Sequence, residues 1–148
     1  IQAVQSIDLI VVDYLQLLMT SNKAPSNSDS RAASMTYISN LLKGLAKDIG
    51  CPLISLSQLN RGVEARTDKR PVLSDLRDSG SIEQDADMVI MLYRQEYYDS
   101  LDNGLAEVII RKNRLGETGE FELGFDGSKS QFMDAEEVAF GRKEYGPI

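Results

Sequence analysis

The sequence predicts an α/β fold in which helices flank a mainly parallel sheet and an antiparallel hairpin closes its C-terminal edge. Three observations predict it: apolar, β-branched runs typical of buried parallel strands, one long amphipathic helix between two of them, and an alternating strand beyond a glycine-containing turn. The chain has 148 residues, of which 42% are apolar and 26% charged. These values are typical of one folded domain with a substantial core.

The first half predicts a strand–helix–strand unit. Ile7–Val12 is an apolar strand with Asp13 at its carboxyl end, and the polar stretch Ser21–Ser30 is a loop whose Ser28, Asp29 or Ser30 can cap a helix. Pro52–Ser57 is the next strand, and Gly50 ends the helix before it. In that helix the apolar residues recur at steps of three and four: Met35, Ile38, Leu42, Leu45 and Ile49. Such a unit is the building block of a doubly wound sheet.

The second half predicts a long loop followed by strands. Arg61–Ser81 is polar and rich in loop formers, whereas Ala86–Tyr93 repeats the pattern of a buried strand. Glycines at 116 and 119 suit a hairpin turn between two further strands, Ala106–Arg111 and Glu120–Phe125. From Asp134 onward the pattern is weak.

Composition excludes several kinds of chemistry. The chain has no histidine, which excludes imidazole bases and histidine-ligated metals, and its one cysteine, Cys51, excludes an internal disulfide. No apolar run approaches the roughly 20 residues that span a bilayer, and no basic-then-apolar leader precedes the first strand. We therefore expect a cytoplasmic protein with no membrane partner. The net charge of −7 argues against a general nucleic-acid coat and leaves room for local basic patches.

Two strand ends carry candidate site residues. Asp13 follows an apolar strand, where a carboxylate can hold a magnesium ion at the carboxyl edge of a parallel sheet, although many buried strands end in a capping aspartate. Gln58 ends the second strand, where its neutral amide can read the γ-phosphate of a nucleotide. A surface glutamine at a strand end is the alternative reading.

Two further segments offer cations and backbone amides. Lys112 and Arg114 share the parity of an extended strand beside the hairpin turn, so both can project toward one target, such as a neighbouring subunit's nucleotide. The alternative is a solvated basic turn. The segment Arg77-Asp78-Ser79-Gly80 suits contact with a sugar-phosphate backbone without base readout, or a capped loop whose acids serve helix ends.

The order of these motifs resembles one family. Four segments carry the resemblance: Leu9-Ile-Val-Val-Asp-Tyr-Leu-Gln-Leu17, Ser55-Leu-Ser-Gln-Leu-Asn-Arg61, Arg70-Pro-Val-Leu-Ser-Asp-Leu-Arg-Asp-Ser-Gly-Ser-Ile-Glu-Gln-Asp-Ala-Asp87 and Lys112-Asn-Arg-Leu-Gly-Glu-Thr-Gly119. They resemble the bacterial replicative DNA helicases, the DnaB family, from about Ile7 to Asp134. The resemblance implies that residues 1–134 are the latter part of a RecA-like P-loop NTPase core, from the Walker B aspartate onward, and that residues 135–148 are a C-terminal tail.

The resemblance also implies roles for the candidate residues. Asp13 is similar to the Walker B aspartate on Mg²⁺, and Gln58 to the γ-phosphate sensor. Lys112 and Arg114 look like the pair that reaches the adjacent subunit's ATP, with Arg114 as the arginine finger. Three residues match the loop that grips single-stranded DNA: Arg77, Asp78 and Gly80. The family assembles as a homo-hexamer, uses ATP and Mg²⁺, and works with a primase and a helicase loader in the full-length protein.

One family motif is missing. No G-x-x-x-x-G-K-[ST] phosphate loop occurs in the chain, and no glycine is followed by lysine. The backbone amides and lysine of that loop supply most phosphate contacts, so we expect this chain alone to be inactive and to expose apolar surface where upstream strands belong. Two other readings stay open: another RecA-like ATPase of DNA repair or recombination, and a non-catalytic interaction fragment.

Overall fold

A computed structural model describes residues 6–20, 28–99 and 104–136 of the chain. The chain divides into two compact units, residues 1–86 and residues 87–148, and each is considered by itself. The predicted polar loop Ser21–Ser30 falls outside the described residues up to residue 27, and its last residues already belong to a helix. Of the predicted tail 135–148, the structure describes residues 135 and 136.

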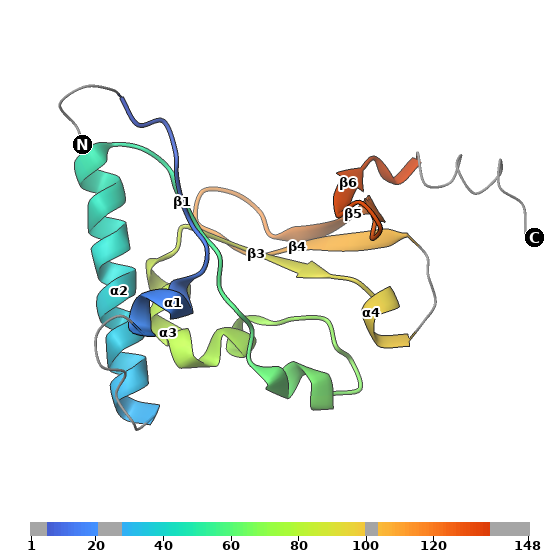
Figure 1. Cartoon of the computed structure of the whole chain (residues 1–148), viewed down its shortest axis with the longest axis horizontal. Coiled ribbons are helices and arrows are strands. Elements are labelled where there is room, and N and C mark those ends of the chain that lie inside the picture. The colour runs from blue at the N-terminus through green and yellow to red at the C-terminus, as the bar shows by residue number, and fades with distance from the viewer. Residues whose placement is uncertain (1–5, 21–27, 100–103, 137–148) are drawn as a thin grey trace, which may run out of the picture. The chain divides into compact units, whose positions relative to one another are not determined.

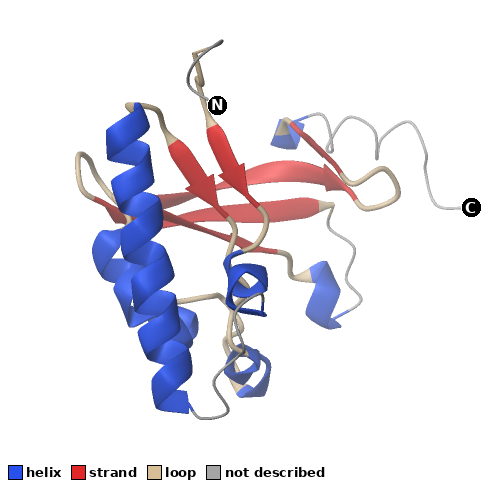
Figure 2. Cartoon of the chain, turned by 60° about the vertical axis from the view of Figure 1, so that its left-hand side comes forward, coloured by secondary structure: helices blue, strands red, loops and turns tan. Residues whose placement is uncertain are grey.

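The first unit is built on a strand–helix–strand crossover, as predicted. Strand β1 (Ile10–Val12) pairs in parallel with β2 (Leu53–Ser55), in the register Ile10↔Leu53 to Val12↔Ser55. The connection between them carries the short helix α1 (Leu15–Thr20) and the long helix α2 (Ser28–Ile49). Figure 2 shows the two strands side by side and pointing the same way. Both strands are shorter than predicted, because the hydrogen-bonded ladder covers only part of each apolar run.

The predicted helical stripe packs the core of this unit. Met35 of α2 is fully buried against Leu15 of α1 and Ile82, and Ile38 and Leu42 pack around them. Gly50 ends α2 with a φ of +75°, and its N–H donates to the Ala46 carbonyl at 2.9 Å. A left-handed glycine of this kind is the stop that the sequence predicts.

Helical turns replace the loop predicted over Arg61–Ser81. The chain forms the 3₁₀ helices η1 (Arg61–Ala65) and η2 (Leu73–Ser79), then helix α3 (Gly80–Asp85), which packs against α2 (Figure 1). The buried Ser39 hydroxyl of α2 donates to Asp85 Oδ2 of α3 at 2.7 Å. The loop prediction was wrong here because such short turns depend on particular capping and packing contacts and have no periodic signal.

The second unit is an antiparallel sheet with strand order β3-β4-β5-β6. Its members are β3 (Met88–Tyr93), β4 (Leu105–Asn113), β5 (Gly119–Asp126) and β6 (Gln131–Met133), with the short helix α4 (Glu96–Asp99) after β3. Strands β4 and β5 form the predicted hairpin, in which Val108 lies opposite Phe121. The α/β class and the antiparallel hairpin are therefore as predicted. The hairpin belongs to a four-stranded sheet of its own, and not to the edge of the parallel sheet of β1 and β2.

The strands are not covered on both faces within the described residues. Val11 is 59% exposed and its cross-strand neighbour Ile54 is 52% exposed. In β3, Val89 and Met91 are buried, whereas Met88, Ile90 and Leu92 are exposed. The described segments pack against one face of these strands only, so apolar side chains are exposed on the other face, as the sequence predicts for this chain alone. Among the described helices, none is long and apolar enough to cross a membrane.

Candidate functional site

Asp13 directly follows β1, at the carboxyl edge of the parallel pair. The Leu56 N–H donates to the Val12 carbonyl at 2.9 Å, and the Leu15 N–H donates to the Leu56 carbonyl at 3.0 Å. These two bonds extend the connection between the strands past the end of the ladder. The Asp13 side chain is exposed, and the peptide bond that joins it to Tyr14 is cis. The structure thus presents one carboxylate to solvent at this edge.

Gln58 follows β2 at the same edge, and its backbone is held by Gln16, a residue that the sequence patterns did not single out. Gln16 of α1 donates from Nε2 to Ser57 Oγ at 3.1 Å and to the Gln58 carbonyl at 3.3 Å. Its Oε1 accepts from the Gln58 N–H at 3.3 Å. One amide therefore binds both backbone groups of Gln58, which leaves the exposed Gln58 side chain at a fixed point of the chain. The available signal was the place of Gln16 within the first motif, shortly after Asp13.

This edge combines groups that suit a magnesium nucleotide. A carboxylate is a hard oxygen ligand, and a neutral amide can donate to or accept from a phosphate oxygen. Magnesium is commonly held by one or two carboxylates together with water and phosphate oxygens. Among the described residues no group of three acidic, histidine or cysteine side chains could hold a metal ion by itself. A magnesium ion at Asp13 would therefore take most of its ligands from water and phosphate.

The segment Arg77–Gly80 adopts helical turns, although the sequence predicts an open loop. Arg77 and Asp78 lie in the last turn of η2, and Gly80 begins α3. Their side chains lie outside the described part of the chain, so the structure gives only their backbone. That backbone continues directly from Asp75, which is buried.

Lys112 and Arg114 belong to the second unit and are held differently. Lys112 is half-buried in β4, opposite Val89 of β3. Arg114 lies in the bend after β4, which ends at Asn113, so strand alternation does not fix its direction. The direction of Arg114 is fixed by Asp87. The Asp87 carbonyl accepts from the Arg114 N–H at 2.8 Å, and Asp87 Oδ1 lies 2.7 Å from Arg114 Nη1. Asp87 is the second contact residue that the sequence patterns did not single out, although it ends the long third motif.

The bend that carries Arg114 is braced by Asn113. Its Oδ1 accepts from the Leu115 N–H at 3.3 Å, and its Nδ2 donates to the Glu117 carbonyl at 3.2 Å. A Cβ on Gly116 would lie 2.8 Å from Asn113 Nδ2, closer than real Cβ atoms come to a neighbour. A side chain at 116 would therefore require the Asn113 amide to move from this position, which agrees with a glycine in the predicted hairpin turn.

Among the described residues, the largest pKa shift is that of Asp126, in the turn between β5 and β6. Lys129 Nζ lies 2.8 Å from Asp126 Oδ2, and the Ser128 hydroxyl donates to Asp126 Oδ1 at 2.6 Å. The Lys129 ammonium, followed by Ser128, holds the pKa of Asp126 well below its usual value, and Asp126 raises the pKa of Lys129. These contacts close a solvated turn and involve none of the predicted site residues.

The structure thus brings the predicted residues together in two groups. Asp13 and Gln58 each follow one of the two paired strands at one sheet edge of the first unit, and Lys112 and Arg114 lie at the end of one strand of the second.

Comparison with known proteins identifies the fold and the family. Two solved structures are similar over 85% of this chain: an ATPase domain, with a TM-score of 0.75 and 42% identity, and a DnaB-like replicative helicase described with its interactions with primase, with a TM-score of 0.76 and 45% identity. The chain covers 44% and 30% of these two chains. The similarity confirms the predicted RecA-like α/β class.

Curated sequence relatives agree with the structures. The chain is 49% identical over 141 residues to the replicative DNA helicase DnaB of Haemophilus influenzae and 50% identical over 141 residues to that of Pasteurella multocida. Each match covers 94% of this chain and 29% of the relative, so the chain spans less than a third of their length. The model of the DnaB-like helicase C-terminal domain matches residues 1–134. The chain therefore belongs to the DnaB-like helicase C-terminal domain family.

Proposed function

We propose that this chain is part of an ATP-dependent, hexameric replicative DNA helicase that translocates on single-stranded DNA and unwinds the duplex at the replication fork. The family supports this proposal, and one structural observation carries it. The parallel register of β1 and β2, with Val12 opposite Ser55, brings Asp13 and Gln58 to the same edge. Ligands of open α/β sheets bind at the carboxyl ends of such strands.

The nucleotide chemistry is assigned to that edge. Asp13 would hold Mg²⁺, which would supply positive charge to the phosphate oxygens of ATP. Gln58 reads the presence of the γ-phosphate through its side-chain amide. Gln16 keeps the Gln58 backbone in register with α1 through its amide contacts. A movement of the Gln58 side chain on binding the γ-phosphate therefore acts on the Gln58 backbone, which Gln16 holds in place.

The second unit is assigned to the neighbouring subunit's nucleotide. Arg114 acts as the arginine finger and Lys112 supports it, while Asp87 orients the Arg114 guanidinium before contact. Arginine fingers in comparable motors increase turnover about a thousandfold or more. Arg77, Asp78 and Gly80 hold the backbone of single-stranded DNA, for which a sequence-independent grip is enough.

The wider context follows from the family. We propose a cytoplasmic protein that works with a primase and a helicase loader, in which residues 1–134 form the helicase-type ATPase segment and residues 135–148 a tail. One similar solved structure is described with its interactions with primase.

Substitution of the finger tests the proposal. In the whole protein that contains this chain, Arg114→Ala should abolish hydrolysis stimulated by single-stranded DNA while the Kd for ATP stays within about threefold, because the finger stabilises transition-state charge and not bound ATP. Lys129→Ala removes another exposed cation of the same unit and should leave both quantities unchanged. Loss of ATP binding by Arg114→Ala, or an equal loss of turnover in Lys129→Ala, contradicts the finger assignment.

The isolated chain offers a second test. The purified 148 residues contain no phosphate-loop motif, so they should show negligible ATPase activity in a phosphate-release assay. Turnover by these residues alone would show that the active site is divided differently.

A further inference from the structure

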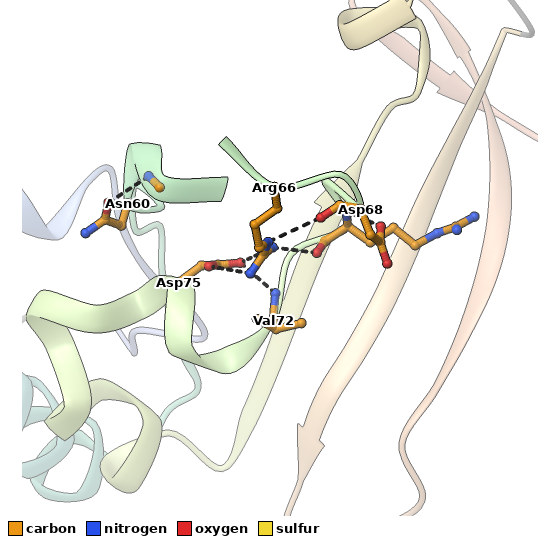
Figure 3. Close-up of polar contacts among 7 residues, drawn as sticks. Asn60, Arg66, Asp68, Val72 and Asp75 are labelled. Carbon is orange, nitrogen blue, oxygen red and sulfur yellow. Dashed lines mark hydrogen bonds and ion pairs between the residues drawn. The ribbon is translucent and has the colours of Figure 1, made fainter. Parts of the chain in front are cut away.

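Arg66, a residue with no assigned role, makes four side-chain hydrogen bonds within the first unit. Its Nη1 and Nη2 bind Asp75 Oδ1 and Oδ2 at 3.0 and 2.9 Å, a two-point contact between guanidinium and carboxylate. Its Nη2 also donates to the Arg70 carbonyl at 2.9 Å, and its Nε to the Asp68 carbonyl at 3.2 Å. Figure 3 shows the Arg66 side chain between Asp75 on one side and Asp68 on the other, with dashed lines to both. Such a paired contact fixes orientation as well as distance.

Asp75 in turn joins two ends of a long connecting segment. Its carbonyl accepts from the Asn60 N–H at 2.9 Å, and its Oδ2 accepts from the Val72 N–H at 2.8 Å. Asn60 caps η1 by accepting from the Gly62 N–H at 2.8 Å. Asp75 is only 7% exposed, so its position is set by these protein groups and not by water.

The two ends of this connection adjoin two predicted functional segments. Asn60 lies two residues after Gln58, and Asp75 lies two residues before Arg77. Without a contact between its two ends, the segment from Asn60 to Asp75 would be a long flexible loop. The Arg66–Asp75 ion pair and the Asn60–Asp75 backbone bond join the two ends of this segment, so only a few hydrogen bonds and two peptide units separate Gln58 from Asp75.

We propose that Arg66 is a positioning residue that couples the nucleotide edge at Gln58 to the DNA segment Arg77–Gly80, by keeping Asp75 fixed to Asn60. This inference rests on the proposed helicase function. Coupling between sites needs a continuous set of packed or hydrogen-bonded groups, and the structure supplies one from Gln16 through Gln58, Asn60 and Asp75. The competing reading is that the ion pair only holds the fold together, so the test must separate coupling from stability.

Two conservative substitutions in the whole protein distinguish a role in coupling from a role in stability. Arg66→Lys keeps the positive charge but cannot make the paired contact or reach both carbonyls, because an ammonium lacks the planar fork. Asp75→Asn keeps the size but turns an NH₂ group toward N–H donors of Arg66 or Val72. Glu64→Gln removes an exposed acid of the same segment and serves as the matched control.

The expected result is a split between basal and stimulated turnover. In Arg66→Lys and Asp75→Asn, stimulation of ATP hydrolysis by single-stranded DNA should fall by about fivefold or more, while basal hydrolysis and the Kd for ATP change by less than about twofold. Glu64→Gln should keep full stimulation. Parallel loss of basal and stimulated turnover, or unchanged stimulation in both variants, overturns the coupling role. A wild-type protein without any DNA stimulation would refute the proposed function instead.

Hydrogen exchange on the wild-type protein keeps the inference testable even if a variant fails to fold. A nonhydrolysable ATP analogue should change the exchange of the Asn60 amide and of the peptide containing residues 77–80 together. In Arg66→Lys, the response at residues 77–80 should disappear while that near Gln58 persists. A response confined to one of the two segments in the wild type, or retained at 77–80 in folded Arg66→Lys, overturns the proposal.

Discussion

Replacing Arg66 by alanine should destabilise the segment between Asn60 and Asp75 by about 2–3 kcal/mol, and the structure shows where this figure comes from. The substitution removes both hydrogen bonds to the Asp75 carboxylate and one to each of two exposed carbonyls. Water can replace the guanidinium at the exposed carbonyls, so those two losses add little. The cost therefore falls on Asp75.

The Asp75 side chain is 9% exposed and keeps only the Val72 N–H after the substitution. Leaving one charge of a buried pair alone costs about 3–5 kcal/mol. Arg66 itself is 35% exposed, which lets water approach the carboxylate and lowers the cost toward about 2–3 kcal/mol. Removal of both charges avoids the unpaired carboxylate, so the double variant Arg66→Ala/Asp75→Ala should cost less than the sum of the single variants by about 1 kcal/mol or more.

Native-state hydrogen exchange of the Asn60 amide measures this energy locally, because its acceptor is the Asp75 backbone carbonyl, which every variant retains. Arg66→Ala should speed its exchange about 30- to 150-fold, since each 1.4 kcal/mol corresponds to about a factor of ten. Glu64→Ala, on the exposed side of the same segment, should stay within about 0.5 kcal/mol of the wild type. Exchange within about threefold of the wild type in Arg66→Ala, or strictly additive costs in the double variant, refutes the reasoning.

Three further predictions follow from the same structure. Gln16→Leu removes the amide contacts at Gln58 and should lower DNA-stimulated turnover severalfold with ATP affinity nearly unchanged, as steady-state kinetics and equilibrium binding would show. The purified 148-residue chain should self-associate through its exposed strand face, and Val11→Lys with Ile54→Lys should shift it toward monomer in light scattering; an unchanged mass argues against that face. The Asp126 carboxyl should titrate below 3.8 by NMR, and Lys129→Ala should raise its midpoint. Because its folded pKa is lowered, its contribution to stability is present above pH 3.8 and is lost only as the pH falls further, so stability should not respond to this group between about pH 5 and 8.

The regular elements could be predicted because their apolar periodicity is visible locally. Alternation in Glu120–Phe125 and the stripe through Met35 and Leu42 locate β5 and α2, and Gly50 marks the helix end. The limits of β1 and β2 could not be read in this way, because apolar content does not show where interstrand hydrogen bonds stop. Helices η1 and η2 escaped prediction because they depend on contacts such as the Asn60 cap, not on a repeat.

The candidate site divides in the same manner. Asp13 and Gln58 are recognisable because polar side chains at strand ends meet at one sheet edge. Gln16, Arg66 and Asp87 are not recognisable, because their partners lie 42, 9 and 27 residues away along the chain. All three lie within or between the motifs that resemble the helicase family, but only the folded chain shows which atoms they bind.

The contacts of these three residues point to a common principle of organisation. Gln16 binds the Gln58 backbone, Arg66 binds Asp75 two residues before Arg77, and Asp87 binds the guanidinium and N–H of Arg114. Each of these three contacts thus restrains a residue at or beside a predicted functional group. Ordering a mobile side chain on binding costs about 0.5–1.5 kcal/mol, and a group ordered beforehand avoids that cost when charge develops in the transition state. Loss of one of these supports should therefore reduce turnover and coupling more than nucleotide affinity, which is the opposite of what loss of a direct ATP contact would do.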